Sequence, residues 1–459
     1  MIFEILYNCI AFIAKNMTFW RKSLHFNALV DIIKKNFGGI KIVEVKIQRE
    51  LKADVAVVGG GTAGVFAAIA AAKSGAKTIL IEKNSILGGT MTAACVNFPG
   101  LFFAWGKQII AGPCWEAIEK TIELGGAKMP EISFKPERHW HEQILVNRFV
   151  YTAVITGMCR DAGVIVISNA MLADAQETET GVELLISEKT GLSRIFADNA
   201  IDATGDANLA QICGFELAKS EKQQPATLQN HLSGYDIGDV ERMDIKTALE
   251  HADFPDEVTE NKLFDWLNKH KIDYHVPCKD ADTSEGRTKL EGDAFLYLLK
   301  IYSFLRKIKG LENLTVDFVA EETGVRETNR IVGEKVVTAE EYISGKIYPD
   351  AVCYAFYPID LHVMSGIEQT FFEENKVGCV PYGALVPNGA RHVLCAGRCI
   401  SSDSYANSAL RVEAVCMADG QAAGCAAAAA AKSGKNVGDV PYSDICAALE
   451  KMGAIIPKK

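Results

Sequence analysis

Three glycines at a fixed spacing give the chain its clearest chemical signal. Residues 53–64 read Ala-Asp-Val-Ala-Val-Val-Gly-Gly-Gly-Thr-Ala-Gly, which predicts a buried strand, a turn and the start of a helix. Gly59 permits the tight turn, Gly61 lets the backbone approach a pyrophosphate, and Gly64 lets the helix pack on the strand. The helix start offers free N–H groups and a positive dipole end to phosphates. The pattern therefore predicts a dinucleotide site.

An acidic residue at the end of the next strand completes this pattern. Residues 78–82 read Thr-Ile-Leu-Ile-Glu, so the carboxylate of Glu82 lies where it can accept hydrogen bonds from a ribose diol. The alternative is an ordinary strand–helix–strand turn, but that interpretation does not explain why the three glycines and Glu82 occur at these positions. A second flexible turn follows at 88–90, where glycine backbone can approach a ligand in a way that bulky side chains would prevent.

Histidine and arginine side chains further along are candidates for moving protons and holding anions. His362 ends a predicted strand and could act as an acid or base, or be a hydrogen-bonded structural histidine. Arg326 and Arg330 lie four residues apart, so on a helix they would share a face that could clamp a carboxylate. Salt bridges to Glu322 and Glu327 are the alternative use of these arginines.

Other polar residues carry weaker signals. Arg411 directly precedes a predicted helix, where it could contact substrate or cofactor, or pair with a neighbouring acid. His231 and Tyr235 lie near a change in composition, where substrate contact is plausible. His139 and His141 are two residues apart with no matching cluster, so we expect no metal site. The chain has no Gly-x-Ser-x-Gly motif to indicate hydrolysis.

Composition excludes several classes of protein. The chain has 459 residues, 49% of them hydrophobic, and a net charge of −10, which argues against a general nucleic-acid binder. The 13 cysteines form no Cys-x-x-Cys pair, which is typical of a cytoplasmic protein with reduced thiols and no zinc or iron–sulfur centre. The chain has no run of about eighteen consecutive apolar residues, so we predict no membrane span. We interpret the apolar residues 1–14 as a docking helix or an extension, because an acid replaces the basic start of a signal peptide.

Nucleotide-type sequence lies at both ends of the chain, with a charged, helical region between them. We therefore predict an N-terminal extension and a dinucleotide domain made of two segments, with the substrate at the seam between that domain and an inserted one. The predicted boundaries are 1–50 for the extension, 51–235 and 376–459 for the two segments, and 236–375 for the inserted domain.

From about residue 45 to 435 the chain resembles the FAD-dependent oxidoreductase family, which is related to fumarate reductase and succinate dehydrogenase flavoproteins. The resemblance implies an α/β fold: a Rossmann-like FAD-binding domain of the glutathione-reductase type, formed by the N- and C-terminal segments, with an inserted α+β substrate or cap domain. The matching stretches are 88–90, 203–206, 224–227, 324–330, 357–362, 380–383, 396–398 and 419–424.

The same resemblance implies which residues contact FAD. The glycines of the first turn would hold the pyrophosphate, Glu82 and Lys83 would lie at the adenosine ribose, and the backbone beside Met171 would face the adenine. Residues 419–422 would present a helix N-terminus to the flavin pyrimidine ring, where the dipole favours the negative charge of reduced flavin. The expected FAD contacts are Gly59, Gly61, Thr62, Ala63, Gly64, Glu82, Lys83, Gly88, Gly89, Thr90, Met171, Gly205, Asp206, Arg398, Gly420, Gln421 and Ala422.

Departures from related patterns narrow the expected chemistry. A single Gly-x-Gly-x-x-Gly argues against a second, NAD(P)H site, and no redox cysteine pair follows the first turn. No histidine follows Gly88–Gly89, so we expect FAD to be bound without a covalent bond. The predicted reaction is hydride transfer between FAD and a small organic substrate. Oxygen, a quinone, a carrier protein or a nicotinamide could be the electron partner, and the oligomeric state stays open. The alternatives are an electron-transfer subunit and an RNA-modifying flavoprotein, the latter disfavoured by the net charge.

Overall fold

The computed structural model describes residues 46–135 and 139–458. The predicted helix or extension at 1–14 lies outside the described residues. Contacts between residues divide the chain into two units, 1–46 and 47–459, and the description below concerns the second unit.

A seven-stranded sheet lies at the centre of the described residues, in the order β5-β2-β1-β8-β7-β6, with β17 also paired to β8. The pairs β5–β2, β2–β1, β1–β8 and β8–β17 are parallel, whereas β8–β7 and β7–β6 are antiparallel. The predicted mixed α/β fold with a Rossmann-like parallel sheet is confirmed. The strands are β1 (Ile47–Val58), β2 (Thr78–Glu82), β5 (Ile165–Ser168), β6 (Met171–Glu177), β7 (Val182–Glu188), β8 (Gly191–Asp202) and β17 (Val393–Cys395).

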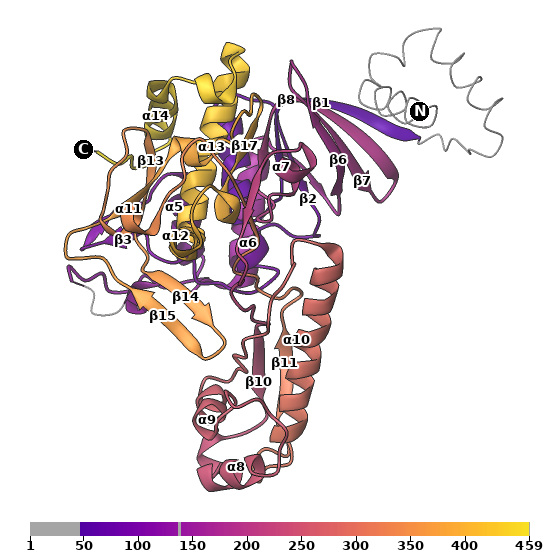
Figure 1. Ribbon diagram of the computed structural model, residues 1–459, viewed down its shortest axis with the longest axis vertical. Helices are drawn as coiled ribbons and strands as arrows, with labels where there is room; N and C mark the ends of the chain where they lie inside the picture. Colours follow the sequence, from indigo (N-terminus) through magenta and orange to yellow (C-terminus); the bar gives the residue numbers. More distant parts are fainter. Residues whose placement is uncertain (1–45, 136–138, 459) are drawn as a thin grey trace, which may run out of the picture. The chain divides into compact units, whose positions relative to one another are not determined.

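Two alanine-rich helices from opposite ends of the sequence pack against each other beside this sheet (Figure 1). They are α4 (Thr62–Lys73) and α13 (Glu413–Ser433). A Cβ added to Gly420 would lie 2.3 Å from the carbonyl oxygen of Ala63, and one added to Gly424 would lie 2.1 Å from that of Ala67. The contact is therefore between backbones, which only small residues permit.

The expected helix start at 419–422 is wrong, because α13 begins at Glu413. The preceding helix α12 (Ser404–Leu410) ends at Arg411, and Val412 has extended backbone angles that separate the two helices. Gly420 lies well inside α13, where it packs closely against α4. A glycine needed for close helix packing thus has the same sequence appearance as one that begins a phosphate-binding turn.

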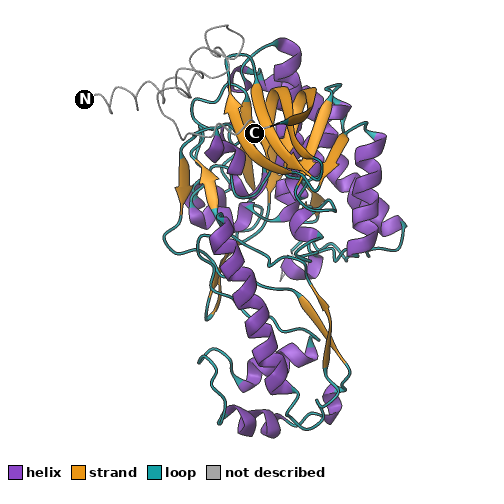
Figure 2. Cartoon of the chain, turned by 90° about the vertical axis from the view of Figure 1, so that its right-hand side faces the viewer, coloured by secondary structure: helices purple, strands orange, loops and turns teal. Residues whose placement is uncertain are grey.

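A second hydrophobic core gathers residues from Ala226 to Val325. Its elements are β10 (Asn230–Ser233), α8 (Arg242–Leu249), α9 (Glu260–Asn268), α10 (Ser284–Leu305) and β11 (Thr315–Val319). The long helix α10 runs from the sheet-bearing body along this core, as the rotated view shows (Figure 2). Nothing in the described part of the chain forms a helix long and apolar enough to cross a membrane.

Shorter elements cover the remaining faces. Helices α5 (Pro113–Glu123) and α6 (Arg148–Asp161) pack beside α4. The hairpin β14 (Ile359–Val363) and β15 (Gly366–Thr370) follows the strand β13 (Ala351–Ala355), which pairs with β16 (Gly378–Pro381). The other elements are β3 (Phe103–Ala104), β4 (Lys107–Gln108), α7 (Asn208–Ile212), β9 (Leu217–Lys219), β12 (Asn329–Ile331), α11 (Ala339–Ile343) and α14 (Tyr442–Lys451).

The contact between α4 and α13 predicts a large effect for a single methyl group. Gly424→Ala should lower the free energy of unfolding by roughly 1–3 kcal/mol, because the methyl group forces the helices apart. Gly157→Ala is the control, since a Cβ at this position in α6 meets nothing within 4 Å. Alanine favours the helix there, so that variant should be neutral or more stable. Urea unfolding followed by circular dichroism measures both, and equal stability of Gly424→Ala and the wild type would contradict the packing argument.

Candidate functional site

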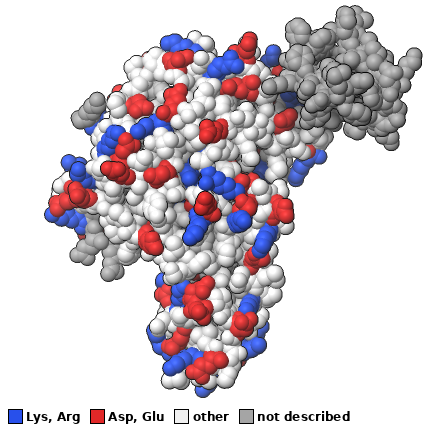
Figure 3. Space-filling view, viewed as in Figure 1, with Lys and Arg blue, Asp and Glu red and all other residues white. Residues whose placement is uncertain are grey.

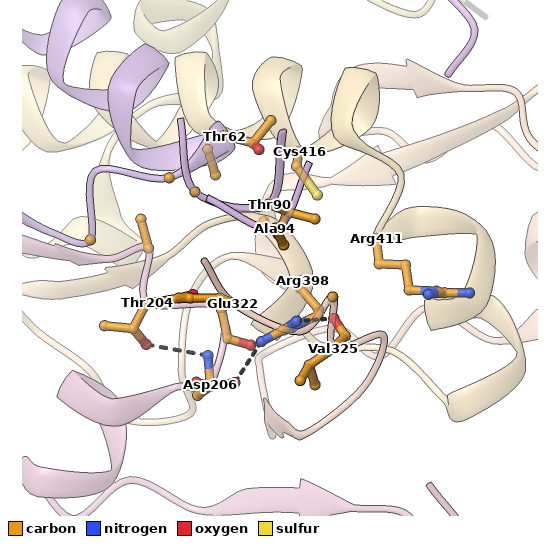
Figure 4. A pocket seen from close by; sticks show the side chains of 18 of the residues that line it. Thr62, Thr90, Ala94, Thr204, Asp206, Glu322, Val325, Arg398, Arg411 and Cys416 are labelled. Atoms are coloured by element: carbon orange, nitrogen blue, oxygen red, sulfur yellow. Dashed lines mark hydrogen bonds and ion pairs between the residues drawn. The ribbon is translucent and has the colours of Figure 1, made fainter. Parts of the chain in front are cut away.

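A cavity of about 690 Å³ lies at the carboxyl ends of the parallel strands. Residues at the carboxyl ends of four strands form part of its wall, which is where open α/β sheets bind their ligands. Val58 and Glu82 are the last residues of β1 and β2, and Ala203 and Ala396 directly follow β8 and β17. Figure 4 shows side chains from the N-terminal, middle and C-terminal parts of the chain around this space.

The first glycine turn is a cradle that side chains would fill. Gly59 has a φ of +102°, and a Cβ there would lie 2.4 Å from the carbonyl oxygen of Ala203. A Cβ on Gly64 would lie 1.8 Å from the Gly59 oxygen, so this glycine lets α4 start against the turn. Beside Gly61 the nearest atom is the Cα of Gly89, at 3.7 Å, which leaves its backbone open to the cavity.

The start of α4 faces the same space without a competing anion. Its N-cap, Gly61, makes no side-chain capping bond, and the first turn contains no acidic residue. Thr62 and Ala63 of that turn line the cavity. The helix N-terminus therefore presents backbone donors and a positive dipole end to whatever fills the cavity.

Glu82 braces the glycine turn as well as lining the cavity. Its carboxylate accepts the backbone N–H of Gly60 at 2.6 Å and that of Asn84 at 2.7 Å. Burial raises the pKa of Glu82, while those two N–H donors and the neighbouring Lys83 act in the opposite direction. Lys83 itself forms an ion pair with Glu322 at 2.7 Å. The bracing of Gly60 is a role for Glu82 that the sequence pattern did not predict.

Most of the residues expected to contact FAD line this cavity. The structure places there Gly59, Gly61, Thr62, Ala63, Glu82, Lys83, Gly89, Thr90, Met171, Gly205, Asp206 and Arg398. The others lie outside the lining: Gly64 and Gly88 support the two turns, and Gly420, Gln421 and Ala422 lie inside α13. Gln421 accepts the backbone N–H of Cys114 at 3.0 Å, which gives it a structural role.

Arg398 ties together three segments of the cavity wall (Figure 4). Its Nε donates to the carbonyl oxygen of Gly205 at 2.8 Å, one terminal nitrogen pairs with Asp206 at 2.5 Å, and the other donates to the carbonyl oxygen of Val325. Its charge and donors therefore hold the turn after β8 beside the loop that precedes β12.

The expectation that Arg326 and Arg330 share a helix face is wrong. Residues 324–328 form no helix, and Arg330 lies in β12, paired with Ala218 of β9. Arg330 is buried and bonds to Glu327 at 2.7 Å, so the salt-bridge alternative holds for it. Arg326 alone of the two lines the cavity. Glu322 pairs instead with Lys83.

His362 lies in the cavity wall in a hydrogen-bonded chain. Its Nε2 is 3.0 Å from Oδ2 of Asp360, and its Nδ1 is 3.3 Å from Nε2 of His275. Burial, reinforced by the charges of Arg326 and Arg411, lowers the pKa of His362 to about 4, despite the opposing effect of Asp360. Both nitrogens of the ring are therefore engaged by the protein.

Two partly buried guanidinium groups lie at the same end of the cavity. Arg411 donates from Nε to Ser408 and from one terminal nitrogen to Gln224 and Asp360, each at 3.2 Å. Arg326 donates to the carbonyl oxygen of Pro225 at 2.6 Å. Burial first, and then the charge of Arg411, lowers the pKa of Arg326 to about 10. Asp273 and Asp360 act in the opposite direction on Arg326, and Asp360 does so on Arg411. Two guanidinium groups in one wall still offer charge-assisted donors to an anion.

Several cavity residues escaped the sequence reasoning. Asp360 had a usable signal, because it lies two residues before His362 and so on the same face of one strand. Thr204 and Tyr357 lie within stretches that match the family but were not singled out, whereas Asn84 and Glu413 had no signal. The weaker candidates lie elsewhere: His231 bonds to Asp317, and Tyr235 donates to the carbonyl oxygen of Leu267. Among the described residues no group of three His, Cys, Asp or Glu side chains could hold a metal ion.

Comparisons with known proteins give one family match and several partial relatives. Residues 54–449 match the model of the family described as FAD dependent oxidoreductase. The thiamine thiazole synthase of Methanococcus vannielii is 25% identical over 34% of this chain and 57% of its own length. The dihydrolipoyl dehydrogenase of Vibrio parahaemolyticus is 28% identical over 35% of this chain and 31% of its own length. The matches thus span less than two thirds of these relatives.

The solved structures that this chain is similar to are more distant in sequence. A geranylgeranyl bacteriochlorophyll reductase-like protein of Thermoplasma acidophilum is 14% identical, with a TM-score of 0.43 over 88% of this chain and 83% of its own. The p-nitrophenol 4-monooxygenase of Pseudomonas putida is 11% identical, with a TM-score of 0.40 over 88% of this chain and 87% of its own.

The double use of Glu82 predicts a strong effect of its removal. Glu82→Ala should weaken FAD binding by roughly tenfold or more, because two backbone donors lose a charged partner and the glycine turn loosens. Fluorescence titration of the apoprotein with FAD measures the dissociation constant. Glu119→Ala, an exposed site on α5, is the control and should bind like the wild type. Unchanged affinity in Glu82→Ala would remove Glu82 from the cofactor site.

Proposed function

Because the chain belongs to the FAD-dependent oxidoreductase family, and FAD is therefore its cofactor, we propose that it transfers a hydride between non-covalently bound FAD and a small organic acid. The observation that carries the proposal is one continuous cavity, which joins the glycine cradle at one end to Arg326, Arg411 and His362 at the other.

The cradle end fits the phosphate half of FAD. Gly59, Gly61 and the first turn of α4 would hold the pyrophosphate, and Glu82 with Lys83 would lie at the ribose, with Met171 toward the adenine. A Cβ at the glycines of this turn would collide with protein or close the space that a phosphate needs. Bound FAD supplies two-electron hydride chemistry, which protein side chains lack.

We further propose that the FAD domain is of the glutathione-reductase type and that the second core is a cap over the substrate. Two features support this assignment. The C-terminal segment adds β17 to the sheet and α13 to α4, so both chain ends build one domain. Residues 281–284, 287 and 322–326, in or next to the second core, also line the cavity.

The arginine end is where we place the substrate. Arg326 and Arg411 would hold a substrate carboxylate, replacing the predicted pairing of Arg326 with Arg330. Arg411 has a terminal nitrogen with no protein partner among the described residues, which leaves donors for a ligand. His362 would help to position the substrate as a ring held by Asp360 and His275, rather than exchange protons.

Other functions and the cellular location follow from weaker observations. An RNA-modifying flavoprotein would need a basic face; the net charge is −10, and acidic and basic side chains are mixed on the face in Figure 3. We propose a cytoplasmic location, because every cysteine among the described residues is free. The electron partner would be a small molecule or a protein that reoxidises or reduces the flavin.

Purification tests the cofactor part of the proposal. The protein should carry absorption bands near roughly 370 and 450 nm, and acid precipitation should release the yellow colour into the supernatant because no covalent bond holds it. Anaerobic addition of candidate organic acids should bleach the bands. A preparation that stays colourless even after incubation with FAD contradicts the proposal. A flavin that only a partner protein reduces would favour an electron-transfer subunit.

Arginine substitution tests the substrate part. Arg411→Gln should raise the KM for an organic acid by roughly tenfold or more, with a much smaller change for the corresponding amide, because a charge-assisted bond is lost only with the acid. Steady-state kinetics on a matched acid and amide measure the difference. Arg160→Gln, whose exposed guanidinium pairs with Asp161, should behave like the wild type. Equal losses for acid and amide would exclude a carboxylate contact.

A further inference from the structure

Glu413 is a buried carboxyl group in the cavity wall that neither the sequence reasoning nor the proposed substrate clamp uses. It is the first residue of α13, its relative exposure is 8%, and it lines the cavity beside Arg411, Val412 and Cys416. Figure 4 shows Cys416, one helical turn further on, between Thr62 and Thr90. Glu413 therefore lies where the C-terminal segment closes the cavity.

No basic side chain neutralises this carboxyl group among the residues that the structure describes. Arg411, two residues earlier, directs its hydrogen bonds to Ser408, Gln224 and Asp360. What favours the ionised form is the backbone N–H of Glu413 itself, at the start of the helix, and the more distant charge of Arg411. Buried carboxyl groups are usually paired, so an unpaired one on a cavity wall is a candidate for function.

The surroundings leave Glu413 poised between its two forms. Burial raises the pKa of Glu413 to about 7, against the opposing effects of the helix start and Arg411. The other titratable groups that face it are Tyr151 on α6, Tyr357 before β14 and Cys416 on α13 itself. Burial raises the pKa of each of these three groups, so they stay neutral while Glu413 titrates.

His362 is a poorer group for moving protons. Both of its ring nitrogens are bonded to protein, and its pKa lies far below neutrality. Resting on the function proposed above, we propose that Glu413 takes up and releases the proton that accompanies hydride transfer in this cavity. In substrate oxidation a C–H bond breaks with its electron pair moving as hydride to FAD. The adjacent O–H or N–H bond breaks with its proton passing to the Glu413 carboxylate, and reduction is the reverse.

Infrared difference spectroscopy tests the proposal without a known substrate. FAD-loaded protein labelled with ¹³C-glutamate is reduced electrochemically about one pH unit above the pKa of about 7, where Glu413 starts ionised. Reduction adds negative charge to the cavity, which raises the proton affinity of a nearby carboxylate. The wild type should therefore gain a carboxylic-acid band that shifts with the ¹³C label, which separates it from flavin carbonyl bands.

Three variants assign the band. Glu413→Gln should lose it. In Glu413→Asp the carboxylic-acid band should remain, but it should no longer shift with the ¹³C-glutamate label. Glu142→Gln, which removes another buried carboxyl group with a raised pKa outside the cavity lining, should keep the wild-type band. Unfolding curves of the apoproteins check that each variant folds.

Two results separate failure of this inference from failure of the proposed function. Bound FAD with no labelled carboxyl band on reduction, or an undiminished band in Glu413→Gln, overturns the role of Glu413 and leaves the oxidoreductase function intact. A wild-type protein that does not bind FAD overturns the proposed function and this inference with it.

Discussion

Close approach of backbone to backbone around the start of α4 is the constraint on which the rest of the structure depends. Gly59 lies against the carbonyl oxygen of Ala203, Gly64 against Gly59, and Gly420 against Ala63. These contacts join the ends of β1 and β8 to both alanine-rich helices. Because no side chain fits between them, the cavity keeps an open floor of backbone N–H groups directly above the sheet.

The features that a local pattern determines could be predicted from sequence. Strand β1, the glycine turn, α4 and Glu82 all lie between residues 47 and 82, and the conformation of each is indicated by its own residues. The parallel sheet follows from the same pattern. The start of α13 could not be found this way, because Gly420 and Gly424 look like a phosphate-binding turn until Ala63 and Ala67 are known to lie against them.

The substrate end was harder because distant segments build it. Arg326 comes from a loop before β12, His362 from β14, and Arg411 and Glu413 from the junction of two helices. Spacing alone paired Arg326 with Arg330, whereas the fold buries Arg330 against Glu327 and brings Arg411 close to Arg326. In the sequence Glu413 cannot be told from other acidic residues that begin helices. Its burial and its position in the cavity wall, which only the structure gives, distinguish it.

The order in which the chain is synthesised gives the pairing of α4 with α13 a further consequence. The first glycine turn leaves the ribosome before α13 does, yet ten residues of α4 are buried, in large part by that helix some 350 residues later. Until α13 emerges, α4 exposes an apolar face, and the cavity lacks Arg411, Glu413 and Cys416. A nascent chain therefore has an incomplete cavity next to a helix with an exposed apolar face. Completion of the C-terminal segment both buries that helix and completes the wall of the cavity.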